Sequence, residues 1–299
     1  MQGDNDRPEP ARTPAVSVII VTWKVRELLR ANLTRLFSLD HGVSFEVLVV
    51  DNNSEDGTVR MIRREFPRVR LVTNDWDAGF AGPNNQALRL AKGQTCILLN
   101  PDMLVEPKAL KTVHDLLTED QTVGVAGIRL IGHDGRPIGS VRRFPDFASQ
   151  LCILLKIGRL FPKLLDRYMF RDFDYYRSQD VDQVRGSFFA FRRELLDRIG
   201  YLDEGYHLWF EEVDFCLRAQ KAGLRIRFSA DAEAHDHVGQ GFALMGHAEK
   251  QAIFTASMVR YFRKHGRPWQ APVLAALRPF AVAAAAGADL FEKLTGKRI

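Results

Sequence analysis

The chain has few cysteines, and their spacing indicates no framework. Cys96, Cys152 and Cys216 are odd in number, far apart and set among apolar residues. Disulfide-rich secreted domains carry even sets of cysteines, and structural zinc sites use pairs such as Cys-x-x-Cys, so the sequence indicates neither. A reducing cytoplasm fits this usage best.

The N-terminus lacks the apolar stretch of a secretory signal, which needs ~7–15 residues. Residues 1–13 are polar and carry charges of both signs, so we predict a disordered tail over residues 1–14. The chain also has no Gly-x-Gly-x-x-Gly dinucleotide fingerprint. What it does have is 299 residues at 46% hydrophobic composition, enough for a full core. A net charge of +5 favours anionic partners such as a phosphorylated ligand or a membrane surface, and no feature supports nucleic acid.

Apolar β-branched runs alternate with helical patterns. The runs at residues 16–22 and 45–50 are typical of strands buried on both faces, and Leu29, Leu33 and Leu36 between them have helical spacing. The Asp134-Gly135 pair predicts a tight hairpin turn and a change to antiparallel pairing. Further helices are predicted near residues 58–66, 84–91, 108–117 and 211–221, and further strands near 69–73, 95–99, 123–128, 184–191 and 225–228. We therefore expect an α/β fold with a mixed, mostly parallel sheet flanked by helices.

Polar motifs follow several of these apolar runs. They are Asp51-Asn-Asn-Ser-Glu-Asp-Gly-Thr58, Asn100-Pro-Asp102 and Glu211-Glu-Val-Asp214. In open α/β sheets ligands bind beyond the carboxyl ends of the strands, so one site assembled from several loops is expected. This layout is typical of an enzyme.

In this order the motifs resemble the family 2 glycosyltransferases of the GT-A fold, especially bacterial rhamnosyltransferase-like members. The resemblance covers about residues 16–266 and also uses the segments 74–84, 186–190 and 210–218. It implies a GT-A catalytic domain over 15–240 and a C-terminal helical extension over 241–299. It further implies an inverting transfer of a sugar, with rhamnose favoured, from a dTDP- or UDP-linked donor. The implied acceptor is a glycan or a polyprenyl-linked lipid in cell-surface polysaccharide synthesis.

The donor candidates come from the end of the first strand, the motif at Asp51, the segment 74–84 and Asn100. Asp51 could accept hydrogen bonds from a uracil or thymine N3–H and from ribose hydroxyls, a role that the resemblance supports. Alternatively, Asn52, Ser54 and Asp56 only form a turn and cap the next helix, and both roles are compatible. Gly79 permits close backbone approach, although a glycine-rich turn with Asn84 as a helix cap would look the same. The predicted donor-binding residues are Thr22, Asp51, Asn53, Ser54, Asn74, Gly79, Asn84 and Asn100.

A divalent cation, Mg²⁺ or Mn²⁺, is implied at Asp102, because a carboxylate there can share the ion with the donor diphosphate. The family's general form is Asp-x-Asp, and Asn100 replaces the first acid. The alternative is an ordinary Asn-Pro-Asp turn. By resemblance His237 is a second candidate ligand and His235 a weaker one, although loop histidines are more often solvated.

The catalytic candidates are Glu212, Glu211 and Asp214. By resemblance Glu212 takes the acceptor proton, and a partly desolvated carboxylate would have the raised pKa useful to a general base. Acids in a first helical turn also complement the helix dipole, and Asp214 with Arg218 has the spacing of an ordinary i, i+4 pair.

Two segments suggest peripheral attachment at the inner face of the cell membrane. Residues 141–175 form a basic amphipathic stretch that could lie on an anionic bilayer or act as an acceptor lid. Residues 272–290 are Ala-rich, but Arg278 keeps the uncharged stretches short of the ~20 residues of a spanning helix. A helix completing the core or a dimer contact is the alternative there. For the whole chain, the other functions considered are a catalytically silent scaffold of a glycan assembly complex and a sugar-nucleotide pyrophosphorylase.

Overall fold

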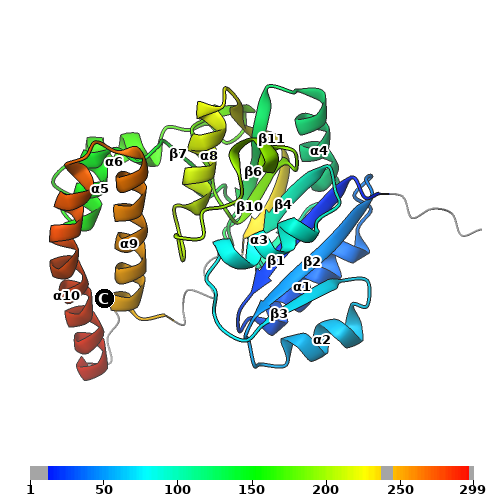
Figure 1. Ribbon diagram of the computed structural model, residues 1–299, viewed down its shortest axis with the longest axis horizontal. Coiled ribbons are helices and arrows are strands. Elements are labelled where there is room, and N and C mark those ends of the chain that lie inside the picture. The colour runs from blue at the N-terminus through cyan, green and yellow to red at the C-terminus, as the bar shows by residue number, and fades with distance from the viewer. Residues whose placement is uncertain (1–12, 237–244, 296–299) are drawn as a thin grey trace, which may run out of the picture.

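A nine-stranded mixed sheet forms the centre of the molecule in the computed structural model, which describes residues 13–236 and 245–295 (Figure 1). The strand order is β3-β2-β1-β4-β10-β6-β11-β5, with β8 beside β11. The strands are β1 (Val16–Thr22), β2 (Phe45–Asn52), β3 (Arg70–Asn74), β4 (Thr95–Leu99), β5 (Met103–Val105), β6 (Val123–Ile131), β8 (Gln179–Val181), β10 (Phe188–Arg192) and β11 (Arg225–Asp236). The pairs β1–β2, β1–β4, β2–β3 and β6–β11 are parallel, and β10 runs antiparallel to β4 and β6. The predicted mixed, mostly parallel sheet is confirmed.

Helices cover both faces of this sheet because strands buried on both sides need an apolar layer on each. One core contains Leu29 and Leu33 of α1, Met61 of α2 and Val113 of α4. The opposite core contains Leu88 of α3. These helices are α1 (Arg26–Ser38), α2 (Thr58–Glu65), α3 (Ala81–Leu90), α4 (Ala109–Glu119), α7 (Leu195–Ile199) and α8 (Glu211–Lys221).

The helix α8 packs between the sheet and a further group of helices, so two of its faces are apolar. Phe215 and Cys216 pack on the sheet side. Val213 and Phe210, the residue before α8, pack on the other side, against a C-terminal helical pair. Figure 1 shows that pair grouped with α5 and α6 at one end of the molecule. The four helices are α5 (Phe147–Leu154), α6 (Pro162–Met169), α9 (His247–His265) and α10 (Gln270–Thr295), and we call them the helical unit.

The predicted hairpin at residues 132–136 is only partly formed. Gly132 N–H donates to the Arg136 carbonyl at 2.9 Å, which closes the turn, but pairing continues only as a single bridge from Ile131 to Pro137. A proline cannot donate to a strand ladder, so the returning chain leaves the sheet. The predicted strand at 184–191 is likewise two strands. β9 (Gln183–Val184) pairs with β7 (Val141–Arg142) in a separate two-stranded sheet, and β10 joins the main one.

The helix α10 extends beyond the predicted Ala-rich segment 272–290 at both ends. An 18-residue stretch within Gln270–Lys293 has a mean hydropathy of 1.5, and the helix would suffice, by length and composition alone, to cross a membrane. Arg278 does not interrupt its outer face, because its guanidinium donates to Thr255 Oγ1 at 3.2 Å and to the Ala252 carbonyl at 3.1 Å on α9. Leu274 and Ala285 are buried while Phe280 is 73% exposed, so one face packs on α9 and another remains apolar and open.

Candidate active site

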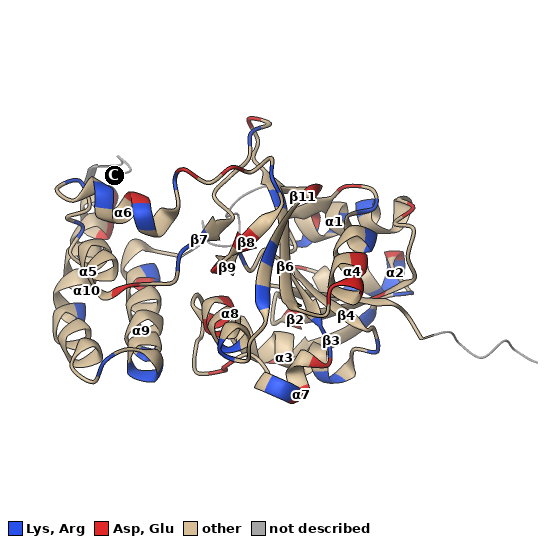
Figure 2. Cartoon of the chain, turned by 90° about the horizontal axis from the view of Figure 1, so that it is seen from above, with Lys and Arg blue, Asp and Glu red and all other residues tan. Residues whose placement is uncertain are grey.

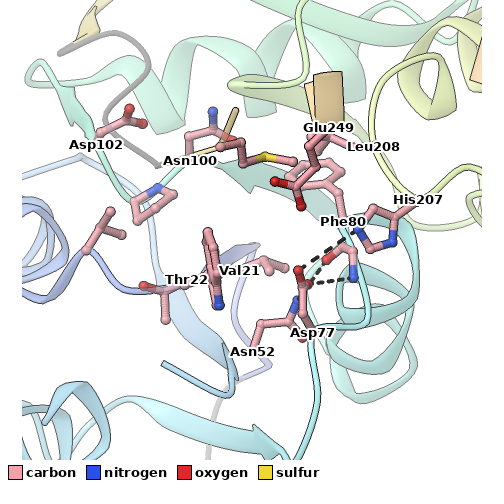
Figure 3. A pocket seen from close by; sticks show the side chains of 15 residues that line it. Val21, Thr22, Asn52, Asp77, Phe80, Asn100, Asp102, His207, Leu208 and Glu249 are labelled. Carbon is pink, nitrogen blue, oxygen red and sulfur yellow. Dashed lines mark hydrogen bonds and ion pairs between the residues drawn. The ribbon is translucent and has the colours of Figure 1, made fainter. Parts of the chain in front are cut away.

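A cavity of about 200 Å³ opens beyond the carboxyl ends of β1, β2 and β4, where the sequence places its polar motifs (Figure 3). Of the predicted donor-binding residues, Thr22, Gly79 and Asn100 line it, and so does the predicted metal ligand Asp102. Much of the remaining wall is formed by Trp23, Asn52, Asp77, Phe80, His207, Leu208 and Glu249. Glu249 belongs to α9, so the C-terminal helices contribute to the site.

Asp51 and Thr22 are buried at the ends of β2 and β1, where they are paired across the parallel ladder. One carboxylate oxygen of Asp51 accepts the Ser54 N–H at 3.2 Å. Among the described residues neither its other oxygen nor Thr22 Oγ1 has a hydrogen-bond partner. Buried polar atoms are normally paired, so a polar ligand group is expected to complete them.

Ser54 fixes the loop that carries Asp51, since its hydroxyl accepts the Lys24 N–H at 3.1 Å. Asp56 accepts the Thr58 N–H at 3.0 Å just before α2, so the turn that was the alternative interpretation is present. Asn53 has a φ of +60° in this turn and does not line the cavity.

Asn52 is the amide that shapes the floor of the cavity. Its side chain donates to Asp77 Oδ1 at 2.7 Å and to the Gly79 carbonyl at 3.0 Å (Figure 3). Its Oδ1 accepts from Asn74 Nδ2 at 3.1 Å. Asn74 therefore supports the loop without lining the cavity. Asn84 is also buried away from the cavity, within α3, and donates to the Phe80 carbonyl at 2.8 Å.

Gly79 is required by close packing as well as by its backbone conformation. Its φ is +71°, and a Cβ placed there would lie 2.3 Å from the His207 carbonyl oxygen. That same oxygen accepts the Phe80 N–H at 2.8 Å. The donor loop is thereby joined to the segment that leads into α8.

Asn100 and Asp102 provide the oxygen atoms that suit a hard divalent cation. Asp102 is 9% exposed and lies at the start of β5, whose Met103 pairs with Asp236 of β11. In the part of the chain that the structure describes, no cluster of three acidic, His or Cys ligands is present, so a cation would need ligands from the donor diphosphate. His235 lies 3.4 Å from Glu106 and does not line the cavity. His237 lies outside the described residues.

A second cavity of about 250 Å³ adjoins the first, and Phe80, Asn100 and Leu208 line both. Glu211 and Glu212 lie on its wall. Burial raises the pKa of Glu211 well above its ordinary value, and the charge of Glu212 raises it further. Burial also raises the pKa of Glu212, against backbone hydrogen bonds and the positive charge of Arg142. In both residues, Oε2 has no hydrogen-bond partner among the described residues. Glu211 is buried and Glu212 half-buried, and two adjacent acids with raised pKa values suit proton transfer.

The loop that leads into α8, directly before these acids, has a strained backbone. Trp209 and Phe210 have φ values of +64° and +71°, a region that aromatic residues rarely adopt. The Leu208 carbonyl accepts from Ser257 of α9 at 2.8 Å, and Phe80 binds the loop from the other side. Strain of this kind is held only where the surroundings fix it, and it is common at functional sites.

Asp214 is occupied by ion pairs and does not line either cavity. It is fully buried and accepts from Arg218 at 2.7 Å, from Lys264 at 2.8 Å and from His265 at 2.7 Å. Burial raises the pKa of Asp214, but the bonds from His265, Lys264 and Arg218 outweigh it, so the pKa is lowered. The i, i+4 pair with Arg218 is confirmed. Through Lys264 and His265, Asp214 also links α8 to α9.

The sequence interpretation missed several lining residues. Asp77 lies within the 74–84 segment and His207 shortly before the 210–218 segment, but neither was singled out as a site residue. Glu249 becomes part of the site only because α9 folds back beside α8. Arg185 lies between β9 and β10, inside what was predicted as one strand. For His207, Glu249 and Arg185, only the tertiary arrangement identifies them as lining residues.

Comparison with known proteins agrees with this geometry. A family model described as glycosyl transferase family 2 matches residues 17–200. The chain is 25% identical over 284 residues to the N-acetylglucosaminyl-diphospho-decaprenol L-rhamnosyltransferase of Mycobacterium tuberculosis, covering 89% of this chain and 90% of that protein. It is 23% identical over 215 residues to a low-salt glycan biosynthesis hexosyltransferase of Haloferax volcanii, covering 71% of this chain but 63% of that protein.

The fold has solved counterparts. A mannosyltransferase from Pyrobaculum calidifontis, solved in complex with GDP-mannose and Mn²⁺, superposes with a TM-score of 0.56 at 22% identity. The alignment covers 99% of this chain and 80% of that one. The two proteins therefore share a fold, and the expected GT-A architecture is confirmed.

Proposed function

Because the chain belongs to glycosyl transferase family 2, we propose that it is an inverting glycosyltransferase that moves a sugar from a nucleotide-diphospho-sugar to a lipid-linked glycan acceptor. The observation that carries the proposal is the pair of adjoining cavities. One has at or near its wall the buried oxygens of Thr22 and Asp51, which have no hydrogen-bond partner among the described residues. The other has the buried acid Glu211 and the half-buried acid Glu212. The transferred sugar would lie where the two cavities meet, beside Asn100, between the donor's diphosphate and the acceptor hydroxyl.

In the proposed reaction Glu212 accepts the proton of an acceptor hydroxyl. The hydroxyl oxygen attacks the anomeric carbon of the donor, and the bond from that carbon to the nucleoside diphosphate breaks on the opposite face, so the configuration inverts. Glu211 would retain its proton, because burial and then the charge of Glu212 both raise its pKa. Glu212 is therefore the free base of the pair.

The donor would be bound through its base and its diphosphate. Asp51 would accept the N3–H of uracil or thymine, which favours UDP- or dTDP-linked sugars. The name of the mycobacterial relative suggests rhamnose as the sugar. Asp102 and Asn100 would hold Mg²⁺ or Mn²⁺, whose charge stabilises the leaving diphosphate. The Mn²⁺ of the Pyrobaculum enzyme supports this choice of ion. We expect Asp102→Ala to abolish metal-dependent donor binding, and equal affinity in the variant would contradict this role.

Transfer of labelled sugar from a panel of dTDP-, UDP- and GDP-sugars to membrane lipid extracts tests the function. Each reaction is run with Mg²⁺, with Mn²⁺ and with chelator. Metal-dependent labelling of a lipid from one donor would support the proposal. Donor binding without labelling from any donor would favour a silent scaffold, and release of inorganic pyrophosphate from a nucleoside triphosphate and a sugar phosphate would favour a pyrophosphorylase.

We also propose that the helical unit attaches the protein to the inner face of the cell membrane. Leu160 is 72% exposed and Phe161 50% exposed between α5 and α6, and Phe280 is 73% exposed on α10. Figure 2 shows basic residues on α6 and on the neighbouring helices. Apolar side chains flanked by lysine and arginine suit an anionic bilayer surface.

Vesicle co-sedimentation distinguishes this from a dimer contact. Phosphatidylglycerol vesicles should bind the protein, and Leu160→Asp with Phe280→Asp should weaken binding more than Tyr176→Asp, a control side chain that is 71% exposed on the sheet domain. Equal binding by all three proteins, or a dimer that Phe280→Asp dissociates, would contradict membrane attachment.

A further inference from the structure

The second cavity has a cationic side to which the proposed reaction assigns no ligand. Antiparallel pairing of β7 with β9 aligns Arg142 with Gln183, and Arg185 follows Gln183 by two residues. Arg142 and Arg185 both line the wall that also carries Glu212. Ser187, 3% exposed, lines the same wall, and its Oγ has no hydrogen-bond partner among the described residues. The cavity therefore presents cationic groups, an unsatisfied hydroxyl and the catalytic acids to one ligand.

The two arginines differ in how their charges are compensated. Arg185 lies 3.3 Å from the buried carboxylate of Asp236. Across residues 13–236 and 245–295, no carboxylate lies within ion-pair distance of Arg142. Arg142 is exposed and lines the cavity wall. A guanidinium binds phosphate oxygens in a fixed, bidentate geometry, and it stays charged at all relevant pH values.

Arg142 also lies on the side of the cavity that faces the helical unit. Its guanidinium is 6.0 Å from the ring centre of Tyr168, a residue of α6. The exposed Leu160 and Phe161 directly precede that helix. Arg142 thus lies on the wall that carries Glu212 and beside a helix that begins at the apolar side chains that we assign to the membrane.

From this arrangement we infer that Arg142 forms an anion subsite for a phosphate group that joins the acceptor saccharide to its lipid. The sugar occupies the cavity beside Glu212, the phosphate binds Arg142, and the lipid continues toward α6. This inference rests on the proposed transfer to a lipid-linked acceptor and specifies the chemistry of the link.

Arg143 provides a matched control. It is adjacent and has the same charge, but its guanidinium stacks 3.7 Å from the ring centre of Phe170 and lies 3.7 Å from Asp182. It lines a different cavity, next to α6, and not the one that holds Glu212.

The test measures the binding of geranyl diphosphate and of geraniol by calorimetry, in chelator so that no metal bridges the probe to Asp102. Wild-type protein should bind geranyl diphosphate at least tenfold more tightly than geraniol. Because a hydrogen bond to a charged group contributes ~1.5–3 kcal/mol, Arg142→Gln should weaken diphosphate binding by about ten- to a hundredfold. Arg143→Gln and Asp102→Ala should retain it.

Equal binding of the two probes, or an Arg142→Gln affinity equal to that of Arg143→Gln, would overturn the inference. Loss of binding in Asp102→Ala alone would also overturn it, by placing the probe in the nucleotide cavity. Phosphatidylglycerol vesicles separate the acceptor phosphate from lipid headgroups: if Arg142→Gln lowers vesicle binding as much as diphosphate binding, the residue recognises the bilayer and not the acceptor. The assay uses no donor and no turnover, so its failure leaves the transfer reaction standing.

Discussion

His265 donates a hydrogen bond of 2.7 Å to Asp214, and this contact joins the helix of the catalytic acids to the C-terminal helical pair. Lys264, beside His265 on α9, contacts the same carboxylate at 2.8 Å. The position of Glu212, two residues before Asp214, therefore depends on helices that lie outside the region matched by the family model.

Removing this carboxylate should destabilise the fold. Breaking a buried ion pair leaves an uncompensated charge, so Asp214→Asn is expected to lower the free energy of unfolding by about 3–5 kcal/mol in urea at pH 7. Asp115→Asn, which removes a surface pair with Lys111 on α4, should cost about 1 kcal/mol or less.

The pH dependence of that difference follows from the lowered pKa of Asp214. A carboxyl whose folded-state pKa is depressed contributes stability above its unfolded value, and the contribution is lost as pH falls through the folded-state pKa. The gap between wild type and Asp214→Asn should be full at pH 7 and shrink below about pH 3.8, the ordinary value. A gap that grows on acidification would contradict this account.

The contact between Gly79 and His207 predicts a second variant. In Gly79→Ala the new Cβ would have to lie 2.3 Å from the His207 carbonyl, so the donor loop must move and donor binding should weaken. Gly135→Ala is the control, because Gly135 has a similar φ of +73° but nothing within 4 Å of a new Cβ. Strain at a positive φ costs about 1–3 kcal/mol in either variant. Only Gly79→Ala should also change the dissociation constant of the donor, and equal donor affinity in both variants would show that the contact does not position the loop.

The raised pKa of Glu212 predicts how kcat/KM for sugar transfer depends on pH on the acid side of the profile. Burial raises its pKa, so kcat/KM for the acceptor should rise with pH through a midpoint above the ordinary value of 4.5. Arg142→Gln removes a positive charge that favours the ionised form and should move the midpoint to higher pH. Glu211→Gln should leave it in place, because Glu211 is already neutral. A midpoint below 4.5, or a downward shift in Arg142→Gln, would contradict the assignment.

The sequence predicts the sheet well where patterning is local. The apolar runs of β1 and β4 and the amphipathic helix α8 have the predicted bounds, since each carries its own periodicity. Strand ends were less accurate. β11 continues for eight residues beyond the predicted Phe228, because its pairing with β6 and β5 is set by tertiary contacts.

The site was predictable where a motif follows a strand, as with Thr22, Asn100 and Asp102, which line the first cavity. It was not predictable where a side chain has a purely tertiary role. Asn74 and Asn84 look like ligands in sequence but bind Asn52 and the Phe80 carbonyl. Asp214 looks like a catalytic acid, and only the folding of α9 against α8 reveals its partners His265 and Lys264.

The most direct test of the account is the single-turnover rate of sugar transfer by Glu212→Gln at saturating donor, beside Glu211→Gln and wild type. Loss of a positioned general base should lower the rate by ~10²–10⁴-fold in Glu212→Gln, with a smaller loss in Glu211→Gln and with donor affinity unchanged in both. A Glu212→Gln rate equal to that of wild type would remove Glu212 from the mechanism.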